Sequence, residues 1–321
     1  MNSKIVIAKI LEPRNLYKAY RKVLANNGSS GIDRMEVTDL REYLSTHQTR
    51  LVREILEGNY VPQAIKGVEI PKRDGKVRLL GIPTVLDRWL QQAVSQHLMR
   101  RFELEFSENS YGFRPKKNLH QGLQKSQRYI NEGYQDIVDI DLKGFFDEVS
   151  HYKLLQLIYD KVKCGTTLRL IRKWLSAPIL KGGRLHKRRK GLPQGSPLSP
   201  LLSNIMLDQL DKYLESSGLL FMLYADDFSI YCRSKEEARG VGNEMYVYLR
   251  DKLCLPINRE KSGIRRPTTF EVLGHSFVPI YQRGIKGKYQ LVASKRGWST
   301  LKRKLKPVSY THLTLPTTSR V

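Results

Sequence analysis

The sequence feature that most constrains the fold is a pair of adjacent aspartates between two apolar segments. Residues 219–232 read LLFMLYADDFSIYC, so Asp226 and Asp227 interrupt a strongly β-forming stretch. We interpret this pattern as strand, acidic turn, strand. Aspartates in a hairpin turn often only cap and solvate the turn. That explanation is weaker here, because adjacent like charges between apolar strands repel each other and favour a bound cation.

A second apolar segment, IVDIDL at 137–142, carries two more aspartates. Asp139 and Asp141 are two residues apart and share a strand face, so spacing alone does not decide which of them meets the acid pair. A sheet can bring this strand end close to the tip of a hairpin. Carboxylate oxygens gathered there suit Mg²⁺, which prefers one or two carboxylates together with waters and substrate phosphates. The sequence therefore predicts a divalent-metal site.

The charge balance predicts a polyanionic partner. The 321 residues include 56 Lys and Arg against 31 Asp and Glu, a formal net charge of +25. Such an excess favours nucleic acid, because lysine and arginine release counterions condensed on a phosphate backbone. The basic residues form four separate blocks, at 71–78, 186–190, 259–266 and 295–306. Any one block is better explained as solvated surface, but several separated blocks suit a groove better than a membrane face.

Other partners and locations are disfavoured by the sequence. The longest apolar run, 218–225, is far shorter than the roughly 20 residues of a bilayer span, so we expect no membrane partner and a cytoplasmic protein. Cysteines 164, 232 and 254 show no C-x-x-C spacing, and the histidines stand singly. We therefore expect buried free thiols rather than disulfides or a zinc finger.

The hydrophobic periodicity changes along the chain. Residues 11–60 have helical spacing broken by a polar turn at 26–33, and residues 66–83 predict a projecting basic hairpin whose turn Gly75 permits. A helix should follow from Asp87, which can serve as its N-cap or as an acid of its first turn. Strands alternating with helices predict an α+β fold.

Three blocks together resemble the reverse transcriptases encoded by group II introns. They are YADD at 224–227, VDIDLKGFFDEV at 138–149 and GLPQGSPLSPLLSNIMLDQLD at 191–211. Four further blocks, at 78–94, 110–123, 255–264 and 270–277, resemble successive blocks of that family in the same order. The likeness covers roughly residues 8 to 306 and is strongest to the compact bacterial members. Seven ordered blocks are far more specific than an acid pair.

The resemblance implies a right-hand polymerase of the α+β class. An N-terminal extension and fingers would occupy 1–135, the palm 136–282, and the start of a helical thumb 283–307. Residues 308–321 change abruptly in composition and resemble translated adapter DNA. We therefore expect them to be a non-native tail that follows a truncated thumb.

The resemblance also assigns residues to the chemistry. The metal ligands would be Asp141, Asp226 and Asp227, with the carbonyl of Leu142 as an extra ligand, for two Mg²⁺ ions that Mn²⁺ can replace. Asp141 is chosen because the family's aspartate lies five residues before an aromatic, here Phe146. Lys261 resembles the general acid that protonates the leaving pyrophosphate; taken alone it would be an ordinary surface lysine.

The nucleotide-binding residues implied by the resemblance lie in several blocks. They are Lys72 and Arg78 on the basic hairpin, Arg114 in SYGFRP, Phe146 as the steric gate against a 2′-hydroxyl, and Gln194 with Gly195 in GLPQGSP. The missing side chain of Gly195 would let the backbone approach the substrate. Alternatives remain open: Phe146 can be core packing, Arg114 can form a structural hydrogen bond, and the Gly-Ser-Pro segment can be a plain loop.

The implied function is RNA-directed DNA polymerisation. An RNA template, a DNA primer, deoxynucleoside triphosphates and the intron RNA would be its partners, and the full-length protein would also assist intron splicing as a maturase. One alternative is an RNA-binding splicing cofactor in which polymerisation is secondary or lost. Another is a domesticated reverse transcriptase of a defence or diversity-generating system.

Overall fold

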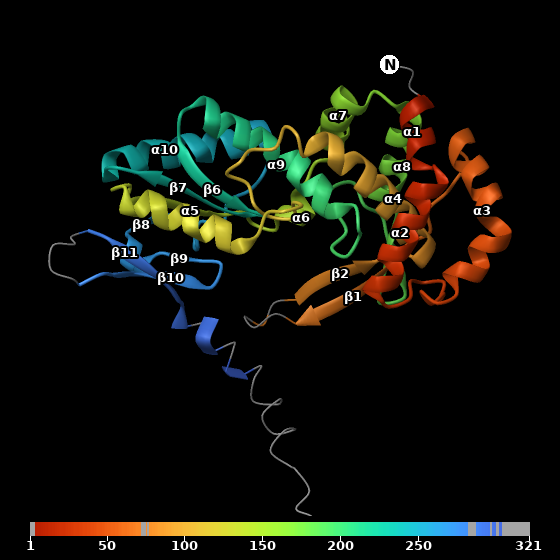
Figure 1. The fold of residues 1–321 in the computed structure, drawn as a ribbon, viewed down its shortest axis with the longest axis horizontal. Coiled ribbons are helices and arrows are strands. Elements are labelled where there is room, and N and C mark those ends of the chain that lie inside the picture. Colours follow the sequence, from red (N-terminus) through yellow and green to blue (C-terminus); the bar gives the residue numbers. More distant parts are fainter. Residues whose placement is uncertain are drawn as a thin grey trace, which may run out of the picture.

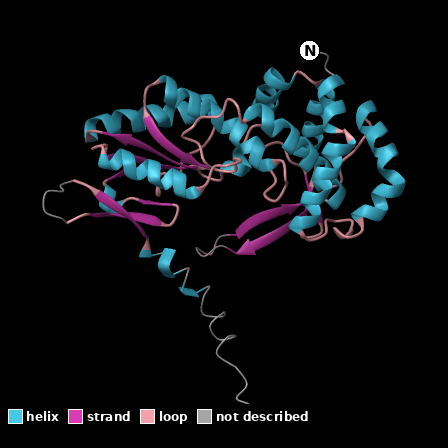
Figure 2. Cartoon of the chain, in the orientation of Figure 1, coloured by secondary structure: helices cyan, strands magenta, loops and turns pink. Residues whose placement is uncertain are grey.

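The computed structural model describes residues 4–71, 75, 77–281, 287–295, 297–299 and 302–303 (Figure 1). The predicted phosphate contact Lys72, the predicted tail 308–321 and much of the predicted thumb segment lie outside the described residues. Helices dominate one half of the molecule, and a helix-covered sheet dominates the other (Figure 2). The predicted α+β class is confirmed.

The helical half is built around one deeply buried helix. Its members are α1 (Lys4–Ile10), α2 (Pro13–Asn26), α3 (Leu40–Glu57), α4 (Val85–Phe102), α7 (His151–Val162) and α8 (Gly165–Ser176). The helix α2 begins with proline at its first position and α3 ends at Gly58 in the left-handed conformation, as helix-end preferences predict. Buried residues surround α4 on most sides, so α4 forms the centre on which α1 and α2 pack.

The basic hairpin predicted at 66–83 is present. Strands β1 (Ile65–Pro71) and β2 (Val77–Ile82) pair antiparallel, and they project from the helical half (Figure 1). Two short strands, β4 (Ile179–Lys181) and β5 (Arg184–His186), extend the sheet in the order β2-β1-β4-β5. Since β1 pairs in parallel with β4, chain segments on both sides of residue 135 share one sheet. The division at 135 and 136 stays a prediction.

The central sheet carries the predicted aspartates. Its antiparallel strands are β3 (Asp136–Asp141), β6 (Leu220–Tyr224), β7 (Asp227–Cys232) and β8 (Gly263–Arg265), in the order β6-β7-β3-β8. Helices α5 (Leu119–Asn131), α9 (Ser199–Ser216) and α10 (Lys235–Tyr248) pack on it. Alternation along β3 places Val138 in the main core with α10, whereas Ile137 belongs to a second core with α5.

A third sheet lies below the central one in Figure 1. It consists of β9 (Glu271–Val272), β10 (His275–Pro279) and β11 (Tyr289–Ala293), in the order β11-β10-β9. The buried rings of Phe270 and Phe277 stack here and join the core beneath α5. The remaining elements are α6 (Phe145–Glu148), the π-helical turn η1 (Leu249–Leu253) and the 3₁₀ turn η2 (Pro267–Thr269).

The structure resolves one local expectation and corrects another. The cap of α4 is Thr84, whose hydroxyl accepts a hydrogen bond from the Asp87 amide, so Asp87 belongs to the first turn and is not the N-cap. The expectation of buried thiols holds for Cys164 and Cys232, but Cys254 is exposed. Among the described helices, none combines the length and apolar character needed to cross a bilayer.

Candidate active site

The acid pair occupies a tight hairpin turn. Tyr224 pairs with Asp227 across β6 and β7, which leaves Ala225 and Asp226 as a two-residue turn. Ala225 has φ 58°, the left-handed conformation that two-residue hairpin turns favour. On the other side of β7, Asp227 pairs with Asp141 of β3. The sheet register therefore brings the strand end and the acid turn together.

The register also separates the two candidate aspartates of β3. Asp139 lies opposite Ser229, and its carboxylate accepts a hydrogen bond from Arg265 Nε at 2.8 Å. Asp141 lies opposite Asp227, and its Oδ2 is 3.6 Å from Lys261 Nζ. Asp141 is thus the residue beside the acid turn, while Asp139 has an arginine partner of its own.

The surroundings of Asp227 disfavour ionisation of its carboxyl group. Burial raises the pKa of the Asp227 carboxyl to about 6, and the charges of Asp226, Asp141 and Asp139 contribute in the same direction. Lys261 acts in the opposite direction by stabilising the charged form. Because desolvation and three neighbouring acids all disfavour the charged form, a divalent cation at this point would stabilise the ionised carboxylates.

The donor set fits an open Mg²⁺ site rather than a closed metal cage. Within the described ranges, no three His, Cys, Asp or Glu side chains converge closely enough to hold a metal ion by themselves. Structural zinc sites need four converging ligands of nitrogen or sulfur type. Mg²⁺ instead takes one or two carboxylates and completes its shell with waters and substrate phosphates. The oxygen donors of Asp141, Asp226 and Asp227 match that second pattern.

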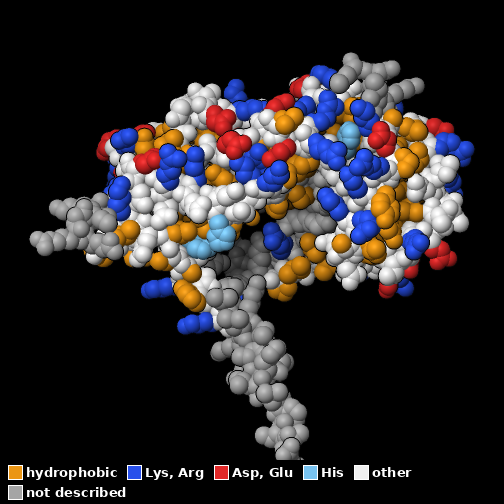
Figure 3. Space-filling model, in the orientation of Figure 1, with side chains coloured by type: hydrophobic (Ala, Val, Ile, Leu, Met, Phe, Trp, Pro, Cys, Tyr) orange, Lys and Arg blue, Asp and Glu red, His pale blue; other side chains and the backbone are white. Residues whose placement is uncertain are grey.

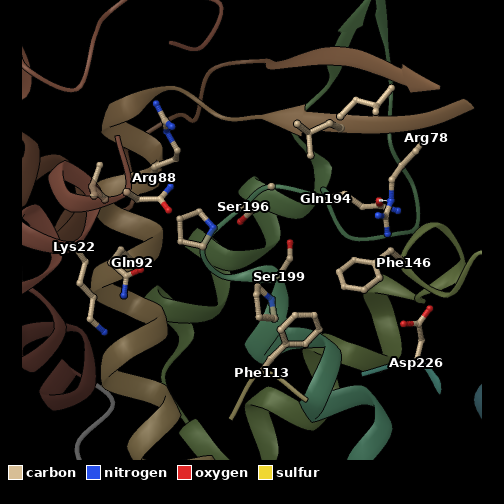
Figure 4. Close-up of a pocket in the computed structure, with 17 residues that line it drawn as sticks. Lys22, Arg78, Arg88, Gln92, Phe113, Phe146, Gln194, Ser196, Ser199 and Asp226 are labelled. Carbon is tan, nitrogen blue, oxygen red and sulfur yellow. Dashed lines mark hydrogen bonds between the residues drawn. The ribbon is translucent and has the colours of Figure 1, made fainter. Parts of the chain in front are cut away.

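A cavity of about 810 Å³ opens beside the acid turn and gathers most of the predicted nucleotide contacts. Arg78, Phe146, Gln194, Gly195 and Asp226 all line it (Figure 4). Arg78 comes from β2 of the basic hairpin, and its Nε donates to Gln194 Oε1 at 2.6 Å. The half-buried Phe146 ring projects into the cavity between Gln194 and Asp226 (Figure 4). Residues from four separate sequence blocks therefore share one space.

The GLPQGSP loop is attached to the hairpin sheet by its backbone. Gly81 of β2 donates to the Gln194 carbonyl at 2.8 Å. Gly195 has φ 125°, and a side chain there would place its Cβ 2.6 Å from the Gly81 carbonyl oxygen. The glycine is required by this close packing within the protein. Gly195 also lines the cavity, and the use of its missing side chain for approach of the substrate stays a prediction.

SYGFRP at 110–115 braces the acid turn. Tyr111 donates its amide to the Leu223 carbonyl at 2.8 Å, beside the YADD turn. A Cβ on Gly112 would lie 2.2 Å from the Ala225 amide nitrogen, so only glycine fits against the turn. Asn204 of α9 holds the Gly112 carbonyl at 3.0 Å. The motif therefore packs against the turn that carries Asp226 and holds that turn in place.

Arg114 lies inside this brace rather than in the cavity. Its side chain is 2% exposed, it forms an ion pair with Glu103, and it donates to the carbonyls of Ser107 and Ser110. These contacts agree with the structural hydrogen-bonding role of Arg114, and its side chain does not line the cavity; the nucleotide contact stays a prediction. Its neighbour Phe113 has φ 57° and lines the cavity (Figure 4). Phe113 was missed, although an aromatic beside SYGFRP's arginine was a visible signal.

The helical half contributes further residues that sequence reasoning missed. Lys22, Arg88 and Gln92 line the same cavity (Figure 4). Arg88 donates to the Ser29 carbonyl at 2.7 Å, which ties the polar loop at 26–33 to α4. No sequence pattern singles out these three side chains, because α2 and α4 meet only through tertiary packing.

A second hollow borders the acids on their other side. Asp141, Asp227 and Lys261 line it together with His275 of β10. Figure 3 shows the molecule hollowed between the β9–β11 sheet and the β1–β2 hairpin. Asp226 thus faces the cavity of Phe146, while Asp141 and Asp227 face the third sheet. The Leu142 backbone bridges to Ile257, and the use of its carbonyl as a metal ligand stays a prediction.

Comparison with known proteins gives this arrangement a family context. Residues 70–277 match the family described as reverse transcriptase (RNA-dependent DNA polymerase). Protein YkfC of Escherichia coli (strain K12) is 28% identical over 89% of this chain and 85% of its own length. The group II intron-encoded protein LtrA of Lactococcus lactis subsp. cremoris is 36% identical over 64% of this chain.

The matched regions cover different shares of the similar proteins. The chain spans 34% of the length of LtrA in the matched region. A solved structure of telomerase from Candida tropicalis covers 77% of this chain with a TM-score of 0.52 and 15% sequence identity. At that identity the likeness concerns the fold alone, and it agrees with the α+β architecture described above.

Proposed function

The chain belongs to the reverse transcriptase (RNA-dependent DNA polymerase) family, and from that premise we propose that it extends a DNA primer by copying an RNA template. Deoxynucleoside triphosphates would be its small substrates. The observation that carries the proposal is the pairing of Asp141 with Asp227 beside the Asp226 turn, next to the cavity of Phe146. The net charge of +25 supports a polyanionic template and primer.

The reaction we propose is attack of the primer 3′-hydroxyl on the α-phosphate of the nucleotide, with pyrophosphate leaving. Two Mg²⁺ ions, held by Asp141, Asp226, Asp227 and the Leu142 carbonyl, would activate the attacking oxygen and stabilise the leaving one. The raised pKa of Asp227 supports this assignment, because the crowded carboxylates favour a bound cation.

The cavity residues would bind and select the nucleotide. Arg78 is exposed at the cavity and can offer its guanidinium fork to the triphosphate, with Lys72 of the same hairpin as a second contact. The Phe146 ring would stand under C2′ of the sugar and exclude a 2′-hydroxyl. Lys261, which lies 3.6 Å from Asp141, is exposed enough to reach the pyrophosphate and give it a proton.

Primer extension on an RNA template tests the assignment. Asp226→Ala should reduce extension by at least about 10³-fold in Mg²⁺ while RNA binding stays nearly unchanged. Asp160→Asn is the matched control, because Asp160 is 63% exposed and, among the residues the structure describes, forms an ion pair with Lys163 alone on the surface. That control should extend primers normally. Extension by Asp226→Ala at the wild-type rate would refute the metal assignment.

We also propose that the protein assists splicing of a group II intron RNA in the bacterial cytoplasm. The similarity to the intron-encoded LtrA supports this role. A splicing assay on an intron RNA beside the extension assay would separate the two activities. Splicing assistance that survives Asp226→Ala would support a distinct RNA-binding function, whereas no assistance from the extended chain would remove this part of the proposal.

A further inference from the structure

A second basic pocket, of about 1020 Å³, lies outside the candidate active site. It is formed by α7, α8 and the segment at 188–189, and it shares no residue with the two hollows beside the aspartates. In Figure 1, α7 lies along the edge of the molecule opposite the β1–β2 hairpin. This pocket is therefore a separate feature that polymerisation at the acid turn does not explain.

The charged lining of the pocket has one sign. Its charged side chains are Arg169, Arg172, Arg188 and Arg189, and no carboxylate from the described part of the chain lines it. Arg172 and Arg189 are exposed. Arg188 is stabilised by the charge of Asp147, whereas Arg169, Arg172 and Arg189 form no ion pair within the described residues. These guanidinium groups make a strong site for phosphate groups, because each fork can bind two phosphate oxygens.

Arg188 has a buried nitrogen that lacks a hydrogen-bond acceptor. It is half-buried, and its Nη2 donates to the Gly191 carbonyl at 2.7 Å. Its Nη1 is buried and has no hydrogen-bond partner. A buried donor without an acceptor is costly, so an oxygen-bearing ligand at this point would remove a penalty that the protein alone leaves in place.

Aromatic side chains complete the pocket. Tyr152 and Tyr159 are seven residues apart on α7 and therefore lie on one face of that helix. Tyr152 is 81% exposed, and within the described residues its ring makes no stacking or cation–π contact. Tyr159 is 46% exposed and is covered on one side by Lys163, 4.9 Å from the ring centre. Exposed rings beside arginines are typical of sites where unpaired bases stack and phosphates pair.

From these observations we propose that the α7–α8 pocket binds a single-stranded nucleic-acid segment at the same time as the active site holds its primer and template. Bases would stack on Tyr152 and Tyr159, and the backbone phosphates would bind the four arginines. Base pairing would hide the base faces from the tyrosines, so a single strand fits better than a duplex. An acidic peptide would satisfy the arginines but would leave the exposed rings unused.

The pocket contacts the active-site loop directly. His151 and Arg188 both hold the Gly191 carbonyl, which begins the GLPQGSP loop, at 2.8 and 2.7 Å. Because a carbonyl only accepts, the His151 Nε2 must carry the hydrogen, and burial lowers the pKa of this ring so that it stays neutral. Substituting His151 or Arg188 would disturb both sites, so neither residue is suitable for the test.

The test uses two exposed arginines and a matched control. A labelled single-stranded 12-mer, as RNA and as DNA, is titrated into protein already saturated with a chain-terminated primer–template. The double variant R172E/R189E should weaken this binding at least tenfold. The variant R41E/R53E removes two exposed arginines of α3 with the same change of net charge, and it should weaken binding less than twofold. Both variants should still extend primers, which shows that they fold.

Salt dependence and crosslinking identify the contacts. Each lost phosphate contact should lower the slope of log affinity against log salt by about 0.7. Tyr152→Ala should weaken binding about tenfold by removing one stacked base. A 5-bromouracil strand should crosslink to α7, and the crosslink should disappear in Tyr152→Ala.

Several results would overturn the proposal. These are equal weakening by R172E/R189E and R41E/R53E, failure of both the RNA and the DNA strand to bind the blocked protein, and crosslinks confined to other segments. Displacement of the strand by poly-glutamate at equal charge concentration would also overturn it, because it would show a site without base recognition. Loss of primer extension in Asp226→Ala does not bear on this test, since binding is measured without chemistry.

Discussion

Asp87 in the helical half and Asp227 in the central sheet are both aspartates whose pKa burial raises, yet their surroundings are opposite in sign. The Asp87 carboxylate accepts hydrogen bonds from Tyr60, Trp174, Thr84 and the Gln63 amide, and these contacts lower its pKa. The neighbours of Asp227 are chiefly acids, which raise its pKa further.

The difference separates a carboxylate whose charge the protein satisfies from one that we propose binds a cation. The donors around Asp87 come from the segment at 58–64, from the N-cap of α4 and from α8, so one side chain joins three parts of the helical half. Its charge is satisfied by the protein itself. Among the described residues, acids surround Asp227, so a cation from outside the chain would stabilise its charge. A raised pKa alone therefore does not distinguish the two aspartates, whereas the sign and number of their partners do.

The largest effect on stability should come from the satisfied site. Asp87→Asn keeps the shape of the side chain but turns an NH₂ group toward donors, so buried N–H and O–H groups lose their acceptor. We expect the free energy of unfolding to fall by about 2–4 kcal/mol in urea denaturation. The surface variant Asp160→Asn should change it by less than about 0.5 kcal/mol. Equal stability of the two variants would contradict the structural role of Asp87.

A smaller loss should follow when only one donor is removed. Tyr60→Phe deletes the hydroxyl that donates to Asp87 at 2.8 Å and leaves the other three donors in place. The free energy of unfolding should fall by about 1–2 kcal/mol. Tyr152→Phe removes a hydroxyl from an 81% exposed ring and should leave the stability unchanged. A Tyr60→Phe protein as stable as wild type would show that the network tolerates a missing donor.

Substitution of Asp227 should instead raise the free energy of unfolding. Asp227→Asn removes one of the repelling charges, so without Mg²⁺ the variant should be more stable than wild type at pH 7.5, although inactive in primer extension. We expect about 1 kcal/mol or less, because the carboxylate keeps contact with water.

The same variant has a defined pH dependence. The folded pKa of Asp227, about 6, lies above the value near 4 expected in the unfolded chain, so the folded state holds its proton more tightly. The contribution of Asp227 to wild-type stability is thus complete below about pH 4 and is lost as pH rises through 6. Urea unfolding in EDTA should show the gap between variant and wild type opening over that range. A gap independent of pH would argue against the crowding of these carboxylates.

The sequence was informative wherever local pattern and chain order suffice. Alternation of apolar residues predicted the strands on both sides of Asp226 and the basic hairpin at 66–83, because side-chain period and turn chemistry are local properties. The helical spacing within 11–60 predicted α2 and α3 for the same reason. The ordered blocks indicated the reverse transcriptase family, which the match over residues 70–277 confirms.

Long-range packing determined contacts that the local sequence pattern does not predict. The sequence left Arg114 open between a nucleotide contact and a structural hydrogen bond, and the fold gives it a buried ion pair with Glu103. Nothing local indicates that the SYGFRP loop packs against the acid turn. The pairing of β1 with β4 likewise joins segments more than a hundred residues apart. Neither contact leaves a periodic trace in the sequence, because the partners are chosen by the fold as a whole.

The sequence by itself determined that this chain carries acidic side chains at strand ends, a large basic excess and the ordered blocks of a polymerase family. It did not decide between Asp139 and Asp141, because residues two apart on a strand face the same way. The family resemblance favoured Asp141, and the tertiary structure supplied the physical distinction by setting Asp141 opposite Asp227 and Asp139 beside Arg265. The physical reason is that strand register depends on the pairing of whole strands, which distant parts of the chain fix together.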